Sequence, residues 1–480
     1  MAIGFISFPL LTRVLSVADY GMLSLTLQVA AMAVVLSKLG LQNSIQRFHQ
    51  EYTAAPEAGS QQRFYSTLLL GAALSAAAVA LLFIVGLQAL PGSWIPSAFR
   101  KVLLVGSGLV FIRAMHPIVM NFLRAERKTK AFNIVDVLTK ATSIGFVCVL
   151  LFAWSRSAKA ALVGTVAIES VALIVLILGV LPRGVISPHA FDEKLYWAAI
   201  TFGLPMVGYE FAAVVLDSGD RLLVNHYLGF QAVGYYSAGY NMATYILNLL
   251  MYPVNLAIFP IYMKLWTDKG ADETRMFLSD ALSHFVMVGL GLMAGVAVTA
   301  RDAVIVLGSR KLQEAYPLLP VLFFGLLLYS LHIFFNPGLV IHKKTFTMAK
   351  IITAAAILNV LLNVVLIPRI GLQGAAVATL ISYGTFLVLI VRESSRVLPL
   401  RVNLVEYLRY LLVAALTVVL VSRFQHSSEW VDLILKGSLS FFVYVALLWL
   451  IDPGIRMRVG LFFRHTTGAS ANAAGQADPI

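Results

Sequence analysis

Charged side chains inside long apolar runs are the residues of this sequence best suited to do chemistry. Lys38, Arg113 and Lys140 each lie within a run of mainly apolar residues. A cation at the depth of a bilayer costs at least about 2.5 kcal/mol on insertion scales, so it normally faces a cavity or a partner. We therefore predict that these three cations line a cavity that binds an anion. The alternative for Lys140 is an ion pair with Asp136, one helical turn away.

Three arginines stand at the ends of apolar runs rather than within them. Arg13 follows the first run, Arg47 follows the second, and Arg221 lies in the short polar segment after the seventh. Long basic side chains at such places can reach into a cavity or extend to the membrane interface. Both interpretations fit equally well, and we retain all three as candidate residues for binding an anionic substrate.

A stripe of polar side chains follows the apolar run 233–262. Its members recur every three or four residues, which places them on one face of a helix. Facing lipid, the stripe would leave hydrogen-bonding groups unpaired, so it must face water or other helices. We favour the wall of a hydrated cavity that binds substrate, with packing between helices as the alternative. The stripe consists of Ser237, Asn241, Thr244, Asn248, Tyr252 and Asn255.

Acidic residues within apolar runs are candidates for energy coupling. Glu169, Glu210 and Asp217 have this position. A carboxylate that exchanges a proton or binds a cation can favour one conformation over another. Glu210 lies alone near the middle of its run and is the first to test, although a buried acid bonded to a neighbour is an equal alternative. Protons, sodium, membrane potential and a substrate gradient all stay open as the driving force.

The elements that position these residues follow from composition. Hydrophobic residues make up 59% of the chain and charged residues only 12%, with a mean hydropathy of +0.85, whereas soluble domains carry roughly 25% charged residues. Runs of about 20 apolar residues can cross a bilayer and must be helical there. We predict an all-α integral membrane protein with fourteen spans, at 1–12, 21–41, 64–90, 102–121, 132–152, 160–181, 196–216, 233–262, 277–299, 317–340, 351–367, 375–391, 407–421 and 431–451.

Charge and cysteine usage narrow the possible functions. The net charge is +13, but the basic residues are scattered between apolar spans, which argues against nucleic-acid binding.

Lys and Arg are concentrated in alternate loops, so the amino terminus is predicted to be cytoplasmic. The densest cluster, Arg124, Arg127, Lys128 and Lys130, is predicted to contact anionic lipid headgroups. Cys148 is the single cysteine, so we expect no cysteine-based metal site and no cofactor.

A short internal repeat suggests a duplicated architecture. LSVADYGMLS, at 15–24, aligns without gaps on LGFQAVGYYS, at 228–237, and shares Leu, Gly and Ser at the same spacing. Transporters often contain such repeats and bind substrate between them. We predict an amino-terminal bundle at 1–181 with a short, apparently truncated first helix, a cytoplasmic linker at 182–195, a second bundle at 196–393, two extra helices at 394–455 and a disordered tail at 456–480.

Four segments resemble the polysaccharide exporters, or oligosaccharide flippases, of the multidrug/oligosaccharidyl-lipid/polysaccharide transporter superfamily. In chain order they are FPLLTRVLSVADYGMLSL, KLGLQNSIQRFHQEY, DRLLVNHYLGFQAVGYYSAGY and LNVVLIPRIGLQGAAVATLIS. The resemblance implies two six-helix bundles around a central cavity and transport by alternating access. It also implies a polyprenyl-pyrophosphate-linked oligosaccharide as cargo, the bacterial inner membrane as location, and membrane lipids, a polysaccharide polymerase and glycosyltransferases as partners.

Two other functions compete with this one. A multidrug antiporter of the same superfamily would export organic cations and should have an acidic, aromatic site. The cations within spans favour an anionic cargo instead. A membrane glycan polymerase or glycosyltransferase would need catalytic groups in a substantial external loop, and we find no nucleophile with a base, no metal cluster and no phosphate-binding loop in the sequence. The identity of the glycan cannot be read from the residues.

Overall fold

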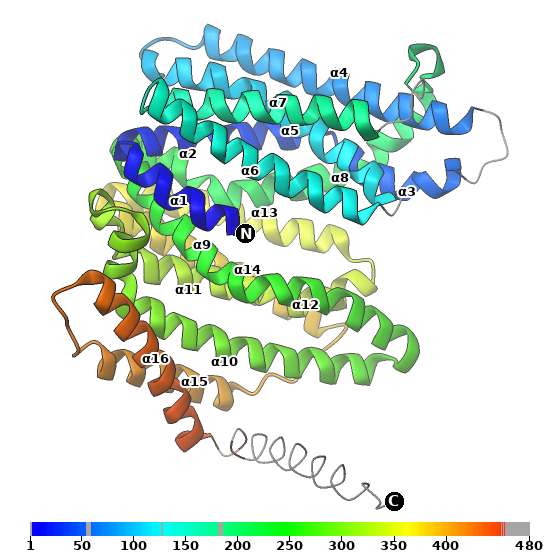
Figure 1. Ribbon diagram of the computed structural model, residues 1–480. Helices are drawn as coiled ribbons and strands as arrows, with labels where there is room; N and C mark the ends of the chain where they lie inside the picture. The colour runs from blue at the N-terminus through cyan, green and yellow to red at the C-terminus, as the bar shows by residue number, and fades with distance from the viewer. Residues whose placement is uncertain are drawn as a thin grey trace, which may run out of the picture.

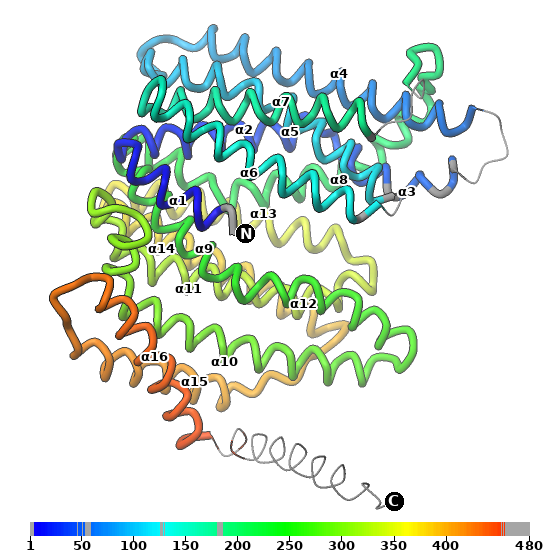
Figure 2. Tube along the Cα trace, viewed as in Figure 1, coloured from blue at the N-terminus to red at the C-terminus, as the bar shows by residue number. Residues whose placement is uncertain are grey.

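The computed structural model is a bundle of long α-helices that run roughly side by side (Figures 1 and 2). It describes residues 2–53, 59–125, 128–180, 186–452, 454 and 456. Apart from Arg456, the predicted tail lies outside the described residues, as do 182–185 of the predicted linker and Arg127 of the basic cluster. Within the described residues, twelve helical stretches are long and apolar enough to cross a membrane, and one of them contains both α8 and α9. The prediction of an all-α membrane protein is confirmed.

Among the described residues, the first half of the chain supplies seven helices before the linker. They are α1 (Ala2–Val14), α2 (Val17–Ser37), α3 (Leu41–Thr53), α4 (Ser60–Ala89), α5 (Ser97–Ala125), α6 (Thr129–Ala153) and α7 (Ala158–Val180).

The second half continues with helices whose lengths range from 3 residues in η1 to 50 residues in α9. They are η1 (Pro188–Ala190), α8 (Glu193–Ser218), α9 (Asp220–Lys269), α10 (Ala271–Ala303), η2 (Val304–Gly308), η3 (Arg310–Ala315), α11 (Leu318–Ser330), α12 (His332–Ile341), α13 (Thr345–Ile370), α14 (Leu372–Ser395), α15 (Leu404–Val421) and α16 (Glu429–Ile451).

Helix α3 is an element that the hydropathy pattern did not predict. Helix α2 ends where Leu39 and Gly40 adopt positive φ angles of 46° and 74°, a conformation that glycine adopts without strain. After this turn, α3 buries Leu41 and Ile45 completely and leaves Arg47 exposed. The helix is amphipathic, so its polar face keeps its mean hydropathy below that of a membrane span.

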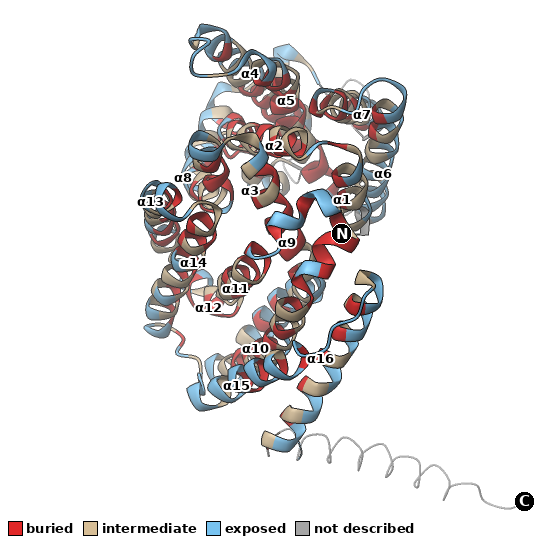
Figure 3. Ribbon diagram, turned by 90° about the vertical axis from the view of Figure 1, so that its left-hand side faces the viewer, coloured by how far each residue is buried: buried red, intermediate tan, exposed pale blue. Residues whose placement is uncertain are grey.

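The helices form two groups that meet along α2, α8 and α9. In Figure 1, α1 to α7 lie on one side, α9 to α14 lie on the other, and α15 and α16 pack at the far edge next to α10. Figure 3 shows buried residues on the inner faces of the helices and exposed ones on the outer faces. Many of the exposed residues are large and apolar, such as Leu82, Leu178 and Phe441. An apolar outer surface of this kind is suited to lipid.

The two copies of the sequence repeat touch each other at the contact between α2 and α9. Ser24 donates a hydrogen bond to Ser237, its equivalent 213 residues later, at 2.8 Å between the two Oγ atoms. A Cβ atom added to Gly21 would lie 2.0 Å from the Phe230 carbonyl oxygen, and one added to Gly234 would lie 2.2 Å from that of Val17. The equivalent glycines therefore allow the two backbones to approach closely, as small residues do where helices cross.

Candidate functional site

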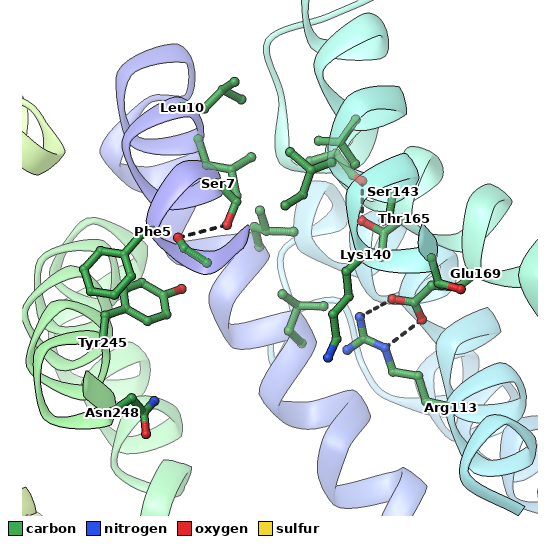
Figure 4. Close-up of a pocket in the computed structure, with 18 residues that line it drawn as sticks. Phe5, Ser7, Leu10, Arg113, Lys140, Ser143, Thr165, Glu169, Tyr245 and Asn248 are labelled. Carbon is green, nitrogen blue, oxygen red and sulfur yellow. Dashed lines mark hydrogen bonds and ion pairs between the residues drawn. The ribbon is translucent and has the colours of Figure 1, made fainter. Parts of the chain in front are cut away.

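A cavity with charged and hydroxyl-bearing side chains in its wall lies between the amino-terminal helices and α9 (Figure 4). Its volume is about 490 Å³, and α1, α2, α5, α6, α7 and α9 contribute to its wall. Arg113, Lys140 and Glu169 stand on one side, while Tyr245 and Asn248 face them from α9. Hydroxyl groups of Ser7, Thr139, Ser143 and Thr165 add hydrogen-bonding capacity, and leucines of α1 and α2 supply an apolar part of the wall.

Arg113 on α5 forms the best-defined interaction in this cavity. Its guanidinium donates two parallel hydrogen bonds to the Glu169 carboxylate on α7, at 2.9 Å from Nε and 2.7 Å from Nη2. The Arg113 side chain retains 35% of its exposure and that of Glu169 retains 19%. A bidentate pair fixes the orientation of the planar guanidinium, and the remaining exposure leaves Arg113 accessible from the cavity.

Lys140 is the more exposed cation of the same wall. Its ammonium group donates to Asp136 at 2.7 Å, one helical turn earlier on α6, and 57% of the side chain is exposed. An exposed pair between i and i+4 contributes only a few tenths of a kcal/mol. The ammonium group can therefore exchange this partner for another anion at little cost.

A second cavity, of about 810 Å³, lies between the two halves of the molecule, where α2 ends and α3 begins. Lys38, the residue directly after α2, forms an ion pair here with Glu210 on α8, and Gln42 donates from Nε2 to the same carboxylate at 3.0 Å. All three cations predicted at membrane depth are thus paired with carboxylates. The two cavity walls are nevertheless not acidic, because each contains two cations and one carboxylate.

The three flanking arginines have three different environments. Arg13 donates to the carbonyl oxygens of Val306 and Gly308, at 2.8 and 3.3 Å, at the end of η2. Arg47 is exposed on α3, beside the Phe48 ring. Arg221 is only 1% exposed, so a substrate cannot reach it in this conformation.

Arg221 belongs to a buried network of polar side chains that the sequence did not predict. Arg221 lies 3.6 Å from Asp220 and donates to Ser237 and to the Asp217 carbonyl. Tyr236 donates to Asp220, and Tyr240 donates to the Asp217 carboxylate at 2.5 Å. Asp217 is therefore bonded within the protein. Thr379 and Tyr383 of α14 complete the network through hydrogen bonds with Tyr236 and Tyr240. Because α14 lies about 140 residues away along the chain, these contacts could not be read from the sequence.

The predicted polar stripe divides along α9. Ser237 and Asn241 bond to Ser24 and Tyr20 of α2, so the first turns of the stripe take part in packing between helices. Thr244 bonds to its own helix. Farther along, Asn248 lines the first cavity, and Tyr252 and Asn255 are exposed.

Fold and cavities together define a class of protein: a helical membrane protein with two helix groups and with charged side chains in the cavities within and between them. The lipid II flippase MurJ, solved in an inward closed conformation, has the same fold with a TM-score of 0.73 and 15% identity, covering 95% of this chain and 97% of that one. The fold is also similar to that of an inward-facing multidrug resistance MATE family transporter of the MOP superfamily. The TM-score is 0.63 and the identity 11%, and the match covers 82% of this chain and 98% of that one. Identities this low show the fold alone.

The chain belongs to the polysaccharide biosynthesis protein family, whose sequence model matches residues 10–317. An uncharacterized membrane protein of Methanocaldococcus jannaschii is 26% identical over 199 residues, which are 40% of this chain and 38% of that protein. A probable low-salt glycan biosynthesis flippase of Haloferax volcanii is 27% identical over 172 residues, or 35% and 36% of the two chains. The matches thus span less than half the length of these relatives.

Proposed function

We propose that this protein is a flippase that moves a polyprenyl-pyrophosphate-linked oligosaccharide across the bacterial inner membrane by alternating access, for the synthesis of a surface polysaccharide. Membership of the polysaccharide biosynthesis family supports the pathway. The similarity to a probable low-salt glycan biosynthesis flippase of Haloferax volcanii supports the activity. Glycosyltransferases and a polymerase of the same pathway are the partners that this function needs.

The composition of the first cavity wall is the observation that carries the proposal. A pyrophosphate needs cations in place of its water, and sugars need hydroxyl and amide groups. Arg113 and Lys140 provide the cations, while Thr139, Ser143 and Asn248 provide hydrogen-bonding groups on both sides. We propose that the phosphate head group displaces Glu169 and Asp136 from the two cations, so that the carboxylates neutralise the cavity when it is empty.

The proposal is tested by assaying transport in cells that depend on this protein for polysaccharide export. We expect Arg113→Ala and Lys140→Ala each to reduce export at least tenfold and to leave lipid-linked glycan on the cytoplasmic side. The matched control is Arg396→Ala, because Arg396 forms an exposed pair with Glu393 outside both cavities. Normal export in both cavity variants would refute the assignment. Efflux of a cationic dye without glycan export would favour the multidrug antiporter.

A further inference from the structure

The second cavity contains polar groups that the proposed transport step does not use. Its wall draws on both halves of the molecule, with Lys38 after α2, α3 and α5 on one side and α8, α12 and α13 on the other. It lies at the end of the bundle that the distribution of Lys and Arg assigns to the cytoplasm. A molecule that enters from the cytoplasmic leaflet would reach this cavity before the first one.

The polar groups of this cavity are incompletely paired. The Glu210 carboxylate is shared by Lys38 and Gln42. Gln42 is only 8% exposed, yet its Oε1 atom is buried without a hydrogen-bond partner in the described part of the chain. Arg124 is exposed and stacks its guanidinium 4.2 Å from the centre of the Phe132 ring, with no carboxylate partner among the described residues. A cation without a carboxylate partner and an acceptor without a donor, within the described part of the chain, suit a ligand that is anionic and carries hydroxyl groups.

Helix α5 connects the two cavities. Arg113 lines the first cavity, while Pro117, Asn121 and Arg124 line the second. These residues are spaced by four, four and three positions, so they share one face of the helix. A helix rises about 1.5 Å per residue, which puts the two arginines roughly 16 Å apart along its axis.

We propose that the second cavity is an entry site for a diphosphate head group, and that the ion pair between Lys38 and Glu210 is a latch that this group opens. The inference rests on the proposed function. Arg124 and Lys38 bind the diphosphate, and Lys38 leaves Glu210 to do so. Because Lys38 belongs to the first half and Glu210 to the second, this exchange removes an ionic contact between the halves and allows them to separate. The head group then passes along α5 to Arg113.

The entry site is tested by measuring the binding of farnesyl diphosphate to the full chain in lipid nanodiscs, with farnesol as the neutral control ligand. We expect Arg124→Gln and Lys38→Met each to raise the Kd about tenfold, as expected for the loss of one charge-assisted hydrogen bond. Glu210→Gln should lower the Kd severalfold, because Lys38 no longer has a competing carboxylate. Arg396→Gln is the matched control and should leave the Kd unchanged.

The opposite signs of the Lys38 and Glu210 effects distinguish a latch from a structural contact. If Glu210→Gln also weakens binding and lowers the melting temperature as Lys38→Met does, the pair is structural and the proposal fails. If only Arg113→Gln weakens binding, the diphosphate binds in the first cavity, so the entry site fails while the proposed function stands. If farnesol binds as tightly as farnesyl diphosphate, neither cavity is an anion site and both proposals lose their basis.

Discussion

At the scale of single residues, burial separates charges that hold the structure together from charges that can bind cargo. Arg221 and Asp220 are 1% and 0% exposed, whereas Lys140 keeps more than half of its side-chain surface. A buried pair that loses one partner leaves an uncompensated charge in the core, while an exposed pair is largely replaced by water. The same type of ion pair therefore has different consequences at the two places.

We expect Arg221→Met to lower the free energy of unfolding by at least about 3 kcal/mol, because Asp220 would stay buried without its cation. Thermal unfolding in detergent measures the effect. The double variant Asp220→Asn with Arg221→Met should recover part of the loss, since no unpaired charge remains. Lys140→Met serves as the exposed control and should change the stability by less than about 1 kcal/mol. Equal losses in the buried and exposed variants would contradict this view.

At the scale of helices, the contacts between neighbouring helices depend on glycines and on buried charged side chains. Gly21 and Gly234 permit the crossing of α2 and α9. Elsewhere, Lys436 on α16 lies 2.6 Å from Asp432 on its own helix and 3.4 Å from Asp302 on α10. The triad joins α16 to α10, and Tyr444 adds a 2.7 Å hydrogen bond to the Met287 carbonyl.

The crossing of α2 and α9 should be intolerant of even a methyl group. We expect Gly21→Ala to destabilise the protein by about 1 to 3 kcal/mol, because its Cβ would overlap the Phe230 carbonyl. Gly384→Ala is the matched control: a Cβ there meets nothing within 4 Å, and alanine favours a helix by up to about 1 kcal/mol. Melting temperatures of the two variants should move in opposite directions. A stable Gly21→Ala protein would show that the two helices separate easily.

The triad on α16 predicts a second effect at this scale. Lys436→Met would leave Asp302 and Asp432 buried near each other without a cation, so we expect a loss of about 3 kcal/mol or more. Limited proteolysis of the loop between α15 and α16 should then become faster. Replacing Lys436 by Met and both Asp302 and Asp432 by Asn should restore resistance to proteolysis. Unchanged proteolysis in Lys436→Met would show that apolar packing alone holds α16.

At the scale of the whole molecule, the two halves must move relative to each other if transport proceeds by alternating access. In this structure they touch at the repeat contact, through Ser24 and Ser237. They also touch toward the other end of α2, where Gly40 packs against Gly203 and Ser44 donates to the Ala199 carbonyl at 2.7 Å. Contacts at both ends describe a conformation that is closed between the halves.

A disulfide across the repeat contact should therefore stop transport. The Oγ atoms of Ser24 and Ser237 lie 2.8 Å apart, so cysteines at both positions are placed to form a bond with little movement. We expect oxidised Ser24→Cys with Ser237→Cys to lose glycan export and to recover it after reduction. Each single cysteine variant is the control and should export normally under both conditions. Full export by the oxidised double variant would exclude separation at this contact.

Local features of the sequence determined the elements of this protein. Apolar runs such as 102–121 and 375–391 predicted helices α5 and α14, because a bilayer-length apolar segment has no other means of pairing its backbone groups. Helix α3 escaped prediction because its apolar residues occupy only one face. The pair between Lys140 and Asp136 could be predicted because it lies within one turn of one helix.

Only the tertiary structure decided which charges meet across helices. Lys38 and Glu210 are 172 residues apart, and Arg113 and Glu169 are 56 apart, so neither pairing leaves a spacing that can be read. The burial of Arg221 could not be read either: the sequence predicted a position at a helix end, whereas the folded protein buries this side chain in the core. Hydropathy and periodicity act within a helix, whereas burial and ion pairing depend on which helix faces pack together.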